Sequence, residues 1–137
     1  DDKLILTDVE YTDKNNAIES MVNMLKEYGY VDDEFMLSVY KRETIIPTYI
    51  KGNIAIPHGL PQHVKKPVIA IAKLKSDIIW SRESKVDIIF LIAYRNDSKK
   101  YFKNFYKVIL NSTVIEEIRN CTNATEIKNV VLDNYKE

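Results

Sequence analysis

The chain has 137 residues and a mass of 16.0 kDa, which suits a single domain with a sizeable core, over residues 1–137, and is too small for two ordinary domains. Twenty basic residues balance twenty acidic ones, so the net charge of zero provides no global field for a nucleic acid. The longest apolar runs have about eight residues, too few to span a bilayer, so we expect no membrane insertion. A single cysteine, Cys121, and an N-terminus without a secretory signal favour the cytoplasm.

The N-terminal part of the chain predicts two helices. The first follows the short apolar run 4–6, with Thr12 as its N-cap and Gly29 as its C-terminal cap. The second begins after the aspartates 32–33, either of which can cap it, and Pro47 prevents its continuation. Apolar residues recur at helical spacing in both, at Ile18, Met21, Val22, Leu25 and Tyr28 and at Phe35, Met36, Val39 and Tyr40.

The middle of the chain changes to short runs that are rich in β-branched residues. These runs show little polar alternation, which is typical of strands covered on both faces. They are residues 54–56, 68–72, 78–79 and 88–93. We therefore expect a central sheet between layers of helix.

The last third of the chain predicts three more helices. Asp97 or Ser98 can cap the first of them. The spacing of a capping box starts the other two, at Thr113 with Glu116 and at Asn123 with Glu126. The order of helices and strands predicts an α/β fold in which a mixed central β-sheet is flanked by helices on both faces.

Two of the three glycines in the chain bracket the segment 52–59, which reads GNIAIPHG. This segment predicts a short strand that runs into a Pro-His-Gly turn. Pro57 fixes its own φ there, and Gly59 permits a close approach of the backbone. The turn displays His58 at the end of a strand, where a histidine either caps backbone groups or carries chemistry.

His58 is the candidate nucleophile. A neutral imidazole is a good nucleophile near its ordinary pKa of about 6.5, and a phosphohistidine can pass its phosphoryl group onward. Arg42 lies sixteen residues earlier, near a predicted helix end, and its guanidinium matches phosphate oxygens bidentately. The alternative for Arg42 is an exposed side chain favoured by the helix C-terminus. Gly52, Asn53 and Gly59 are the expected backbone support of a phosphate site.

Several motifs together resemble one family. The pair Arg42-Glu43, the segment 52–59, the run 78–80 and the strand 86–93 are similar to the type-2 IIA domain of the sugar phosphotransferase system, in its fructose and mannitol branch. The resemblance covers nearly the whole chain. It implies that family's mixed sheet, phosphorylation of His58 by the phosphocarrier HPr, at Nε2, and a position for Arg42 beside the imidazole.

One departure from the family concerns Tyr101. Transport IIA domains of this branch place a second histidine there in our alignment, whereas the segment 100–107 looks more like the IIA-like C-terminal modules of transcriptional activators and antiterminators. The absence of an initiator Met fits such a module and equally fits a trimmed chain. The expected function is therefore the regulatory input module of a sugar-responsive transcription regulator, with upstream regulatory domains on the same chain.

Two other functions stay open. A IIA component of a fructose- or mannitol-type uptake system would pass phosphate from HPr to a IIB domain, and a docking module would bind such proteins without being phosphorylated. His63 lies close to His58, but no further Cys or His pair has ligand spacing, so neither a metal nor another cofactor is expected. Cys121 lacks the glycine-rich turn of a phosphocysteine loop, and we expect it to be structural.

Overall fold

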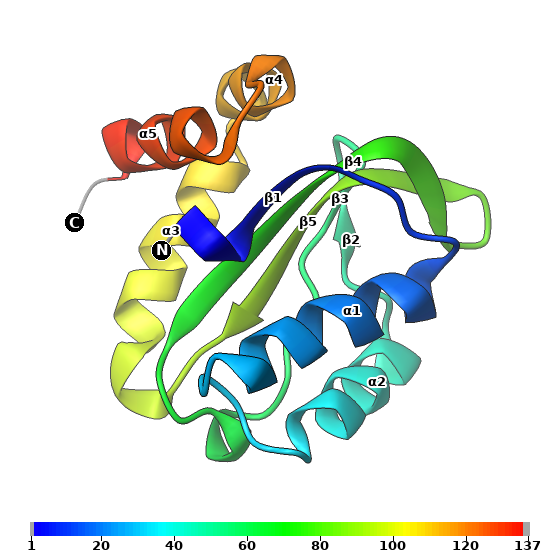
Figure 1. Cartoon of the computed structure of the whole chain (residues 1–137), viewed down its shortest axis with the longest axis vertical. Helices are drawn as coiled ribbons and strands as arrows, with labels where there is room; N and C mark the ends of the chain where they lie inside the picture. Colours follow the sequence, from blue (N-terminus) through cyan, green and yellow to red (C-terminus); the bar gives the residue numbers. More distant parts are fainter. Residues whose placement is uncertain (1, 136–137) are drawn as a thin grey trace.

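The computed structural model describes residues 2–135, and its centre is a five-stranded mixed sheet (Figure 1). β1 is parallel to β4 and β3 is parallel to β5, whereas β4 with β5 and β2 with β3 are antiparallel. The strands, in spatial order, are β1 (Ile5–Val9), β4 (Val68–Ser81), β5 (Ser84–Ala93), β3 (Ile54–Ala55) and β2 (Tyr49–Ile50). The expected mixed central sheet is confirmed.

In the described part of the chain, five α-helices cover the two faces of this sheet (Figure 1). On one face lie α1 (Lys14–Glu27) and α2 (Phe35–Ile45). On the other lie α3 (Lys99–Ile109), α4 (Ser112–Asn120) and α5 (Ala124–Asn134). Three short 3-10 turns complete the described elements: Asp2–Leu4, Pro61–His63 and Asn96–Ser98. Within residues 2–135, no helix has the length and apolarity needed to cross a bilayer.

The two helical layers explain why the predicted strands show so little polar alternation. Along β5, Ile89 and Leu91 are fully buried in the core beneath α1 and α2. Ile88 and Phe90 are fully buried in the core on the opposite face, beneath α3 to α5. A strand that faces a core on both sides has no place for polar side chains.

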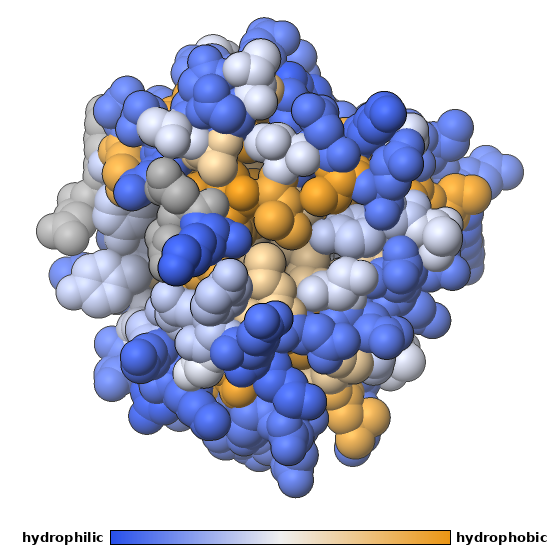
Figure 2. Space-filling view, in the orientation of Figure 1, coloured by the Kyte–Doolittle hydropathy of each residue, from blue (hydrophilic) through white to orange (hydrophobic). Residues whose placement is uncertain are grey.

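The first strand, β1, was not predicted. It lies at an edge of the sheet, and its residues pair with a strand far along the chain, as Ile5 does with Ile71. The pairing is irregular between Thr7 and Val9, where Asp8 has a φ of +56°. Figure 2 shows apolar residues in the middle of the face where β1 lies, between α1 and the helices α4 and α5, so this edge is only partly covered.

The predicted runs 68–72 and 78–79 belong to one strand rather than two. β4 continues through the polar residues between them, and the exposed Lys75 and Asp77 lie there. The pairing with β5 shifts register between Lys73 and Ile78. An irregular, solvent-facing stretch of strand carries none of the apolar signal on which the prediction depended.

The helix caps were predicted in part. Gly29, with a φ of +81°, ends α1 as expected, but Asp13 rather than Thr12 caps its start, and the Asp13 carboxylate accepts the N–H of Asn16 at 2.8 Å. The N-cap position of α2 is Glu34, which makes no side-chain capping bond, rather than residue 32 or 33. The Asp32 carboxylate nevertheless accepts the Glu34 N–H at 2.9 Å, so one of the two expected residues does bond a backbone N–H at the start of this helix.

At the three C-terminal helices, Ser98 is the N-cap of α3, although its side chain makes no capping bond to the helix. Asn111 rather than Thr113 caps α4, and its side chain accepts the N–H of Thr113 at 3.0 Å. Asn123 caps α5 as expected, accepting the N–H of Glu126 at 2.9 Å. Where two capping residues lie close together in the sequence, propensity alone does not decide which one the backbone uses.

Candidate functional site

His58 lies where β3 ends and the chain leaves the sheet. It forms an isolated parallel bridge with Ile92 of β5, and the Ile92 N–H donates to the Pro57 carbonyl at 2.9 Å. On the other side, the Ile56 N–H donates to the Thr48 carbonyl at 2.7 Å. The backbone on the N-terminal side of the half-buried imidazole is therefore held from both sides.

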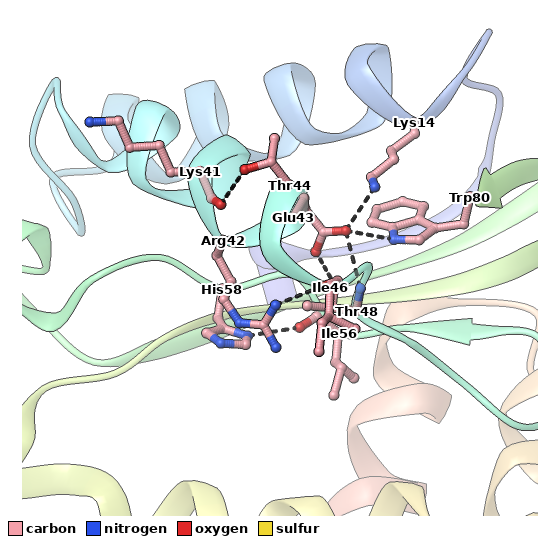
Figure 3. A network of polar contacts seen from close by, with 10 residues as sticks. All are labelled: Lys14, Lys41, Arg42, Glu43, Thr44, Ile46, Thr48, Ile56, His58 and Trp80. Atoms are coloured by element: carbon pink, nitrogen blue, oxygen red, sulfur yellow. Dashed lines mark hydrogen bonds and ion pairs between the residues drawn. The ribbon is translucent and has the colours of Figure 1, made fainter. Parts of the chain in front are cut away.

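The imidazole has a defined tautomer. Nδ1 of His58 lies 3.1 Å from the carbonyl oxygen of Ile56 (Figure 3). Because a carbonyl only accepts, Nδ1 carries the proton, and the lone pair of the neutral ring is at Nε2. Burial, and to a smaller extent the charge of Arg42, lower the pKa of His58 below 6.5, although the bond to Ile56 opposes this shift. The nucleophilic neutral form is thus favoured at neutral pH.

Arg42, in the last turn of α2, brings its guanidinium close enough to the imidazole for its charge to act on His58 (Figure 3). Its Nη1 donates to the Ile46 carbonyl at 2.6 Å. Within residues 2–135 this is the one hydrogen bond of the guanidinium, so the remaining N–H groups are available to an anion. The two residues chosen from the sequence as the reactive pair therefore lie together.

Glu43 is a functional candidate to which the sequence analysis gave no role. It is buried on α2 next to Arg42, and its carboxylate accepts hydrogen bonds from Trp80 Nε1 at 3.0 Å and from the Thr48 N–H at 3.1 Å and hydroxyl. Lys14 of α1 forms an ion pair with it at 2.8 Å (Figure 3). Each of these partners donates to Glu43. A carboxylate, which only accepts, suits such a set of donors better than any neutral side chain does.

This carboxylate connects the helical layer to the histidine. Glu43 holds Thr48, the Thr48 carbonyl accepts the Ile56 N–H, and the Ile56 carbonyl accepts Nδ1–H of His58. A signal for Glu43 was present in the sequence, because it falls at i+8 from Phe35 on the buried stripe of α2. A charged residue on a buried helical face needs partners, and here those partners position the site.

Gly59 contributes through packing. A Cβ at this position would lie 2.5 Å from Ser38 Oγ and 2.7 Å from Phe35 Cε1, so only glycine lets the turn approach α2. The next residue, Leu60, donates its N–H to Ser38 Oγ at 3.0 Å. The close approach at Gly59 is to a helix, and it fixes the chain that follows His58.

Gly52 and Asn53 lie in the turn between β2 and β3, with φ values of +99° and +64°. The Asn53 carbonyl accepts the N–H of Asp87, which is five residues before Ile92, the bridge partner of His58, on β5. At about 3.3 Å per residue, this turn is roughly 16 Å from the His58 end of the strand. The structure does not bring Gly52 and Asn53 to the imidazole.

Tyr101 also lies away from His58. It is 54% exposed and lines a separate apolar groove of about 420 Å³ with Ile5 and Tyr135. The groove beside His58 has a volume of about 470 Å³. The residues of α3 that line it are Lys99, Phe102, Lys103, Tyr106 and Lys107. The position aligned with a second histidine thus does not face the imidazole.

The remaining histidine and the cysteine have local partners. His63 Nδ1 lies 3.1 Å from an Asp32 carboxylate oxygen. Cys121 is buried, burial raises the pKa of its thiol, and its Sγ donates to the Glu117 carbonyl at 3.2 Å. Over residues 2–135, no three His, Cys, Asp or Glu side chains are grouped so as to hold a metal ion.

Solved structures share this fold. The crystal structure of mannitol IIA from Escherichia coli superposes with a TM-score of 0.81 over 94% of this chain and 96% of that chain, at 21% identity. The complex of mannitol enzyme IIA with phosphorylated enzyme IIB, also from Escherichia coli, gives a TM-score of 0.85 over 96% and 95%, at 21% identity. The fold is therefore that of the mannitol IIA proteins.

The sequence profile described as "Phosphoenolpyruvate-dependent sugar phosphotransferase system, EIIA 2" matches residues 1–134, and the chain belongs to this family. Transcriptional regulator ManR of Bacillus subtilis is 32% identical over 103 residues, which are 75% of this chain and 16% of the regulator. The multiphosphoryl transfer protein of Rhodobacter capsulatus is 33% identical over 89 residues, 63% of this chain and 11% of that protein. The chain thus spans less than a fifth of either relative. The resemblance found in the sequence is confirmed.

Proposed function

We propose that this IIA domain accepts a phosphoryl group from phosphorylated HPr on Nε2 of His58, as the regulatory input module of a sugar-responsive transcription regulator. The observation that carries the proposal is the bond from Nδ1–H to the Ile56 carbonyl, which leaves the Nε2 lone pair free beside Arg42. The proposal places the domain in the cytoplasm, with HPr as its partner and no direct contact with nucleic acid.

In the proposed step, the Nε2 lone pair of His58 attacks phosphorus. The new N–P bond forms while the bond from phosphorus to the donor nitrogen breaks, and the donor keeps that electron pair. Arg42 binds the phosphoryl oxygens with its free N–H groups and offsets their charge. The Ile56 carbonyl holds the Nδ1 proton, so the ring keeps its orientation as it gains positive character.

The regulatory context is supported by the similar proteins. Besides ManR, the probable licABCH operon regulator of Bacillus subtilis is 26% identical over 107 residues, 78% of this chain and 16% of that protein. Phosphorylation adds about −1.5 to −2 charges at one point of the surface, which is enough to reorganise a contact with a neighbouring domain. We infer that further regulatory domains precede this one in the whole protein.

A second function, transfer of the phosphoryl group to a IIB domain, is favoured by different relatives. The mannitol-specific EIICBA component of Vibrio cholerae is 33% identical over 89 residues, which are 61% of this chain and 14% of that protein. The fold match to an enzyme IIA in complex with phosphorylated enzyme IIB also fits a relay. A docking module that is never phosphorylated is the third alternative.

One experiment separates phosphorylation from docking. The protein is incubated with phosphoenolpyruvate, enzyme I and HPr, and its intact mass is compared with that of His58→Ala and of the control His63→Ala. We expect one added phosphate in the parent and in His63→Ala, and none in His58→Ala. Absence of phosphate in the parent would leave only the docking module, and rapid transfer from the labelled domain to a IIB protein would favour the relay over the switch.

A further inference from the structure

The groove beside His58 has an apolar floor and a basic wall. Ile92 lines it from β5, Ile56 lines it from the segment that follows β3, and Phe102 and Tyr106 line it from α3. The wall is formed by three exposed lysines of α3, namely Lys99, Lys103 and Lys107. Inorganic phosphate would make no favourable contact with the apolar floor. The groove therefore indicates a ligand that has both apolar and anionic groups.

The three lysines form a row on one side of the helix, slightly inclined to its axis, because positions i, i+4 and i+8 lie on successive turns. Their backbone positions are about 6 Å apart along the axis, at about 1.5 Å per residue. Within residues 2–135, none of the three has an acidic partner in an ion pair. The row therefore presents uncompensated positive charge to the groove.

Helix stability accounts for Lys107, which lies in the last turn of α3, but not for the other two lysines. Lys99 lies in the first turn of α3, where the helix dipole disfavours a cation, and that turn has no acidic residue. Lys103 has a like charge four residues away on either side, at Lys99 and Lys107, which is also unfavourable. Local rules of this kind are broken mainly where a binding function requires it.

We propose that this groove docks an acidic amphipathic helix of a partner protein, and that phosphorylation of His58 releases it. The helix carries carboxylates four residues apart, which repeat at the spacing of the lysine row, and apolar residues between them that cover the floor. No helix of the described chain carries such a row of carboxylates, so the ligand is not a second copy of this domain.

The release step rests on the proposed function of His58. A phosphoryl group on Nε2 adds about −1.5 to −2 charges to the same groove, where it repels the carboxylates of the helix and attracts the lysines. Binding and phosphorylation then oppose each other reciprocally, because the coupling between two sites is the same in both directions. The unphosphorylated domain is the form that binds.

The docking part is tested with a synthetic helical peptide of about five turns that has Glu at every fourth position and Leu beside it. Its affinity is measured by calorimetry for the parent and for the triple variant Lys99→Glu, Lys103→Glu, Lys107→Glu. The matched control is Lys65→Glu, Lys66→Glu, Lys75→Glu, which changes the net charge equally at exposed sites outside the groove.

We expect the groove variant to bind at least about tenfold more weakly than the parent, and the control to stay within about twofold. A peptide with Lys in place of Glu should bind the groove variant better than it binds the parent. Equal losses in the two triple variants would overturn the docking site, because the effect would then follow net charge alone.

The release part is tested by repeating the titration after phosphorylation, with intact mass measured on the same sample. Affinity that falls about tenfold or more supports the switch, and unchanged affinity in a sample shown to carry phosphate overturns it. A sample that takes up no phosphate refutes the proposed function and the switch together, and the unphosphorylated titration still decides the docking site.

Discussion

Replacement of Glu43 tests whether its carboxylate holds the His58 site together. Glu43→Gln keeps the shape of the side chain, so its carbonyl oxygen can still accept from the Thr48 N–H and from Trp80 Nε1. Its amide group can donate to the Thr48 hydroxyl, which rotates to accept. Only Lys14 then lacks its counter-charge, whereas Glu43→Ala removes every one of these contacts.

The structure gives different magnitudes for the two variants. Removal of one partner of a buried ion pair costs about 3–5 kcal/mol, which we expect for Glu43→Ala. Glu43→Gln should cost about 1–2 kcal/mol, because the Lys14 side chain is 21% exposed and its ammonium also lies 5.2 Å from the centroid of the Trp80 ring. The exposed Glu116, paired with Arg119 at 2.5 Å, is the control, and Glu116→Ala should cost no more than about 1 kcal/mol.

The free energy of unfolding in urea measures these costs, and the rate of His58 phosphorylation measures the effect on the site. We expect Glu43→Ala to slow phosphorylation in the fraction that stays folded, because Thr48 and then Ile56 lose their anchor. If Glu43→Ala costs no more than the Glu116 control, or if it phosphorylates at the parental rate while folded, the carboxylate does not position the histidine.

Three further variants test the assigned roles. Arg42→Ala should slow phosphorylation roughly 10–100-fold, since a charge-assisted bond contributes about 1.5–3 kcal/mol, and parental kinetics would remove Arg42 from the site. The lowered pKa of His58 means that its contribution to stability is complete above pH 6.5 and is lost as the pH falls from 6.5 through the folded pKa. His58→Gln should reduce the dependence of the free energy of unfolding on pH below pH 6.5. A pKa of His58 above 6.5, measured by NMR titration, would contradict this prediction. Tyr101→His should leave phosphoryl transfer to any IIB protein unchanged, because residue 101 lines the groove that does not contain His58. Faster transfer would show that a histidine at residue 101 does act on the His58 site.

The sequence predicted those elements of the fold whose signal is local. The apolar stripe of α1 and the β-branched run of β5 depend on neighbours along the chain, and both were placed correctly. β1 depends on pairing with a strand more than sixty residues later, for example Ile5 with Ile71, and five residues at a sheet edge have no periodic signal of their own. The polar middle of β4 was missed because Lys75 and Asp77 face solvent and the pairing with β5 is irregular between Lys73 and Ile78, so this stretch has no apolar pattern of its own.

The motifs predicted that His58 and Arg42 lie side by side, which the structure shows, but they did not predict the surroundings of the two residues. Gly52 and Asn53 are close to His58 in sequence, but the extended chain of β3 lies between them and rises by about 3.3 Å per residue. Residues that are near in the sequence are therefore far apart in the structure. Glu43 and Trp80 show the opposite case. They are 37 residues apart in the chain, yet Trp80 donates a hydrogen bond to Glu43. Contacts of this kind are set by how α2 packs on the sheet, which no local pattern encodes.

The lysine row has a cost that can be measured without knowledge of its ligand. Lys103→Gln removes the repulsion with Lys99 and with Lys107, each about 0.2–0.5 kcal/mol, so the variant should be more stable than the parent by about 0.4–1 kcal/mol. Lys65→Gln, in a loop, is the control and should change stability by less than about 0.5 kcal/mol. The gain should disappear in 1 M salt, where the screening length falls to about 3 Å, and a gain that persists there would mean that repulsion is not its cause. The lysine row lowers the stability of the free domain through charge repulsion, and an anionic ligand bound in the groove would compensate this repulsion.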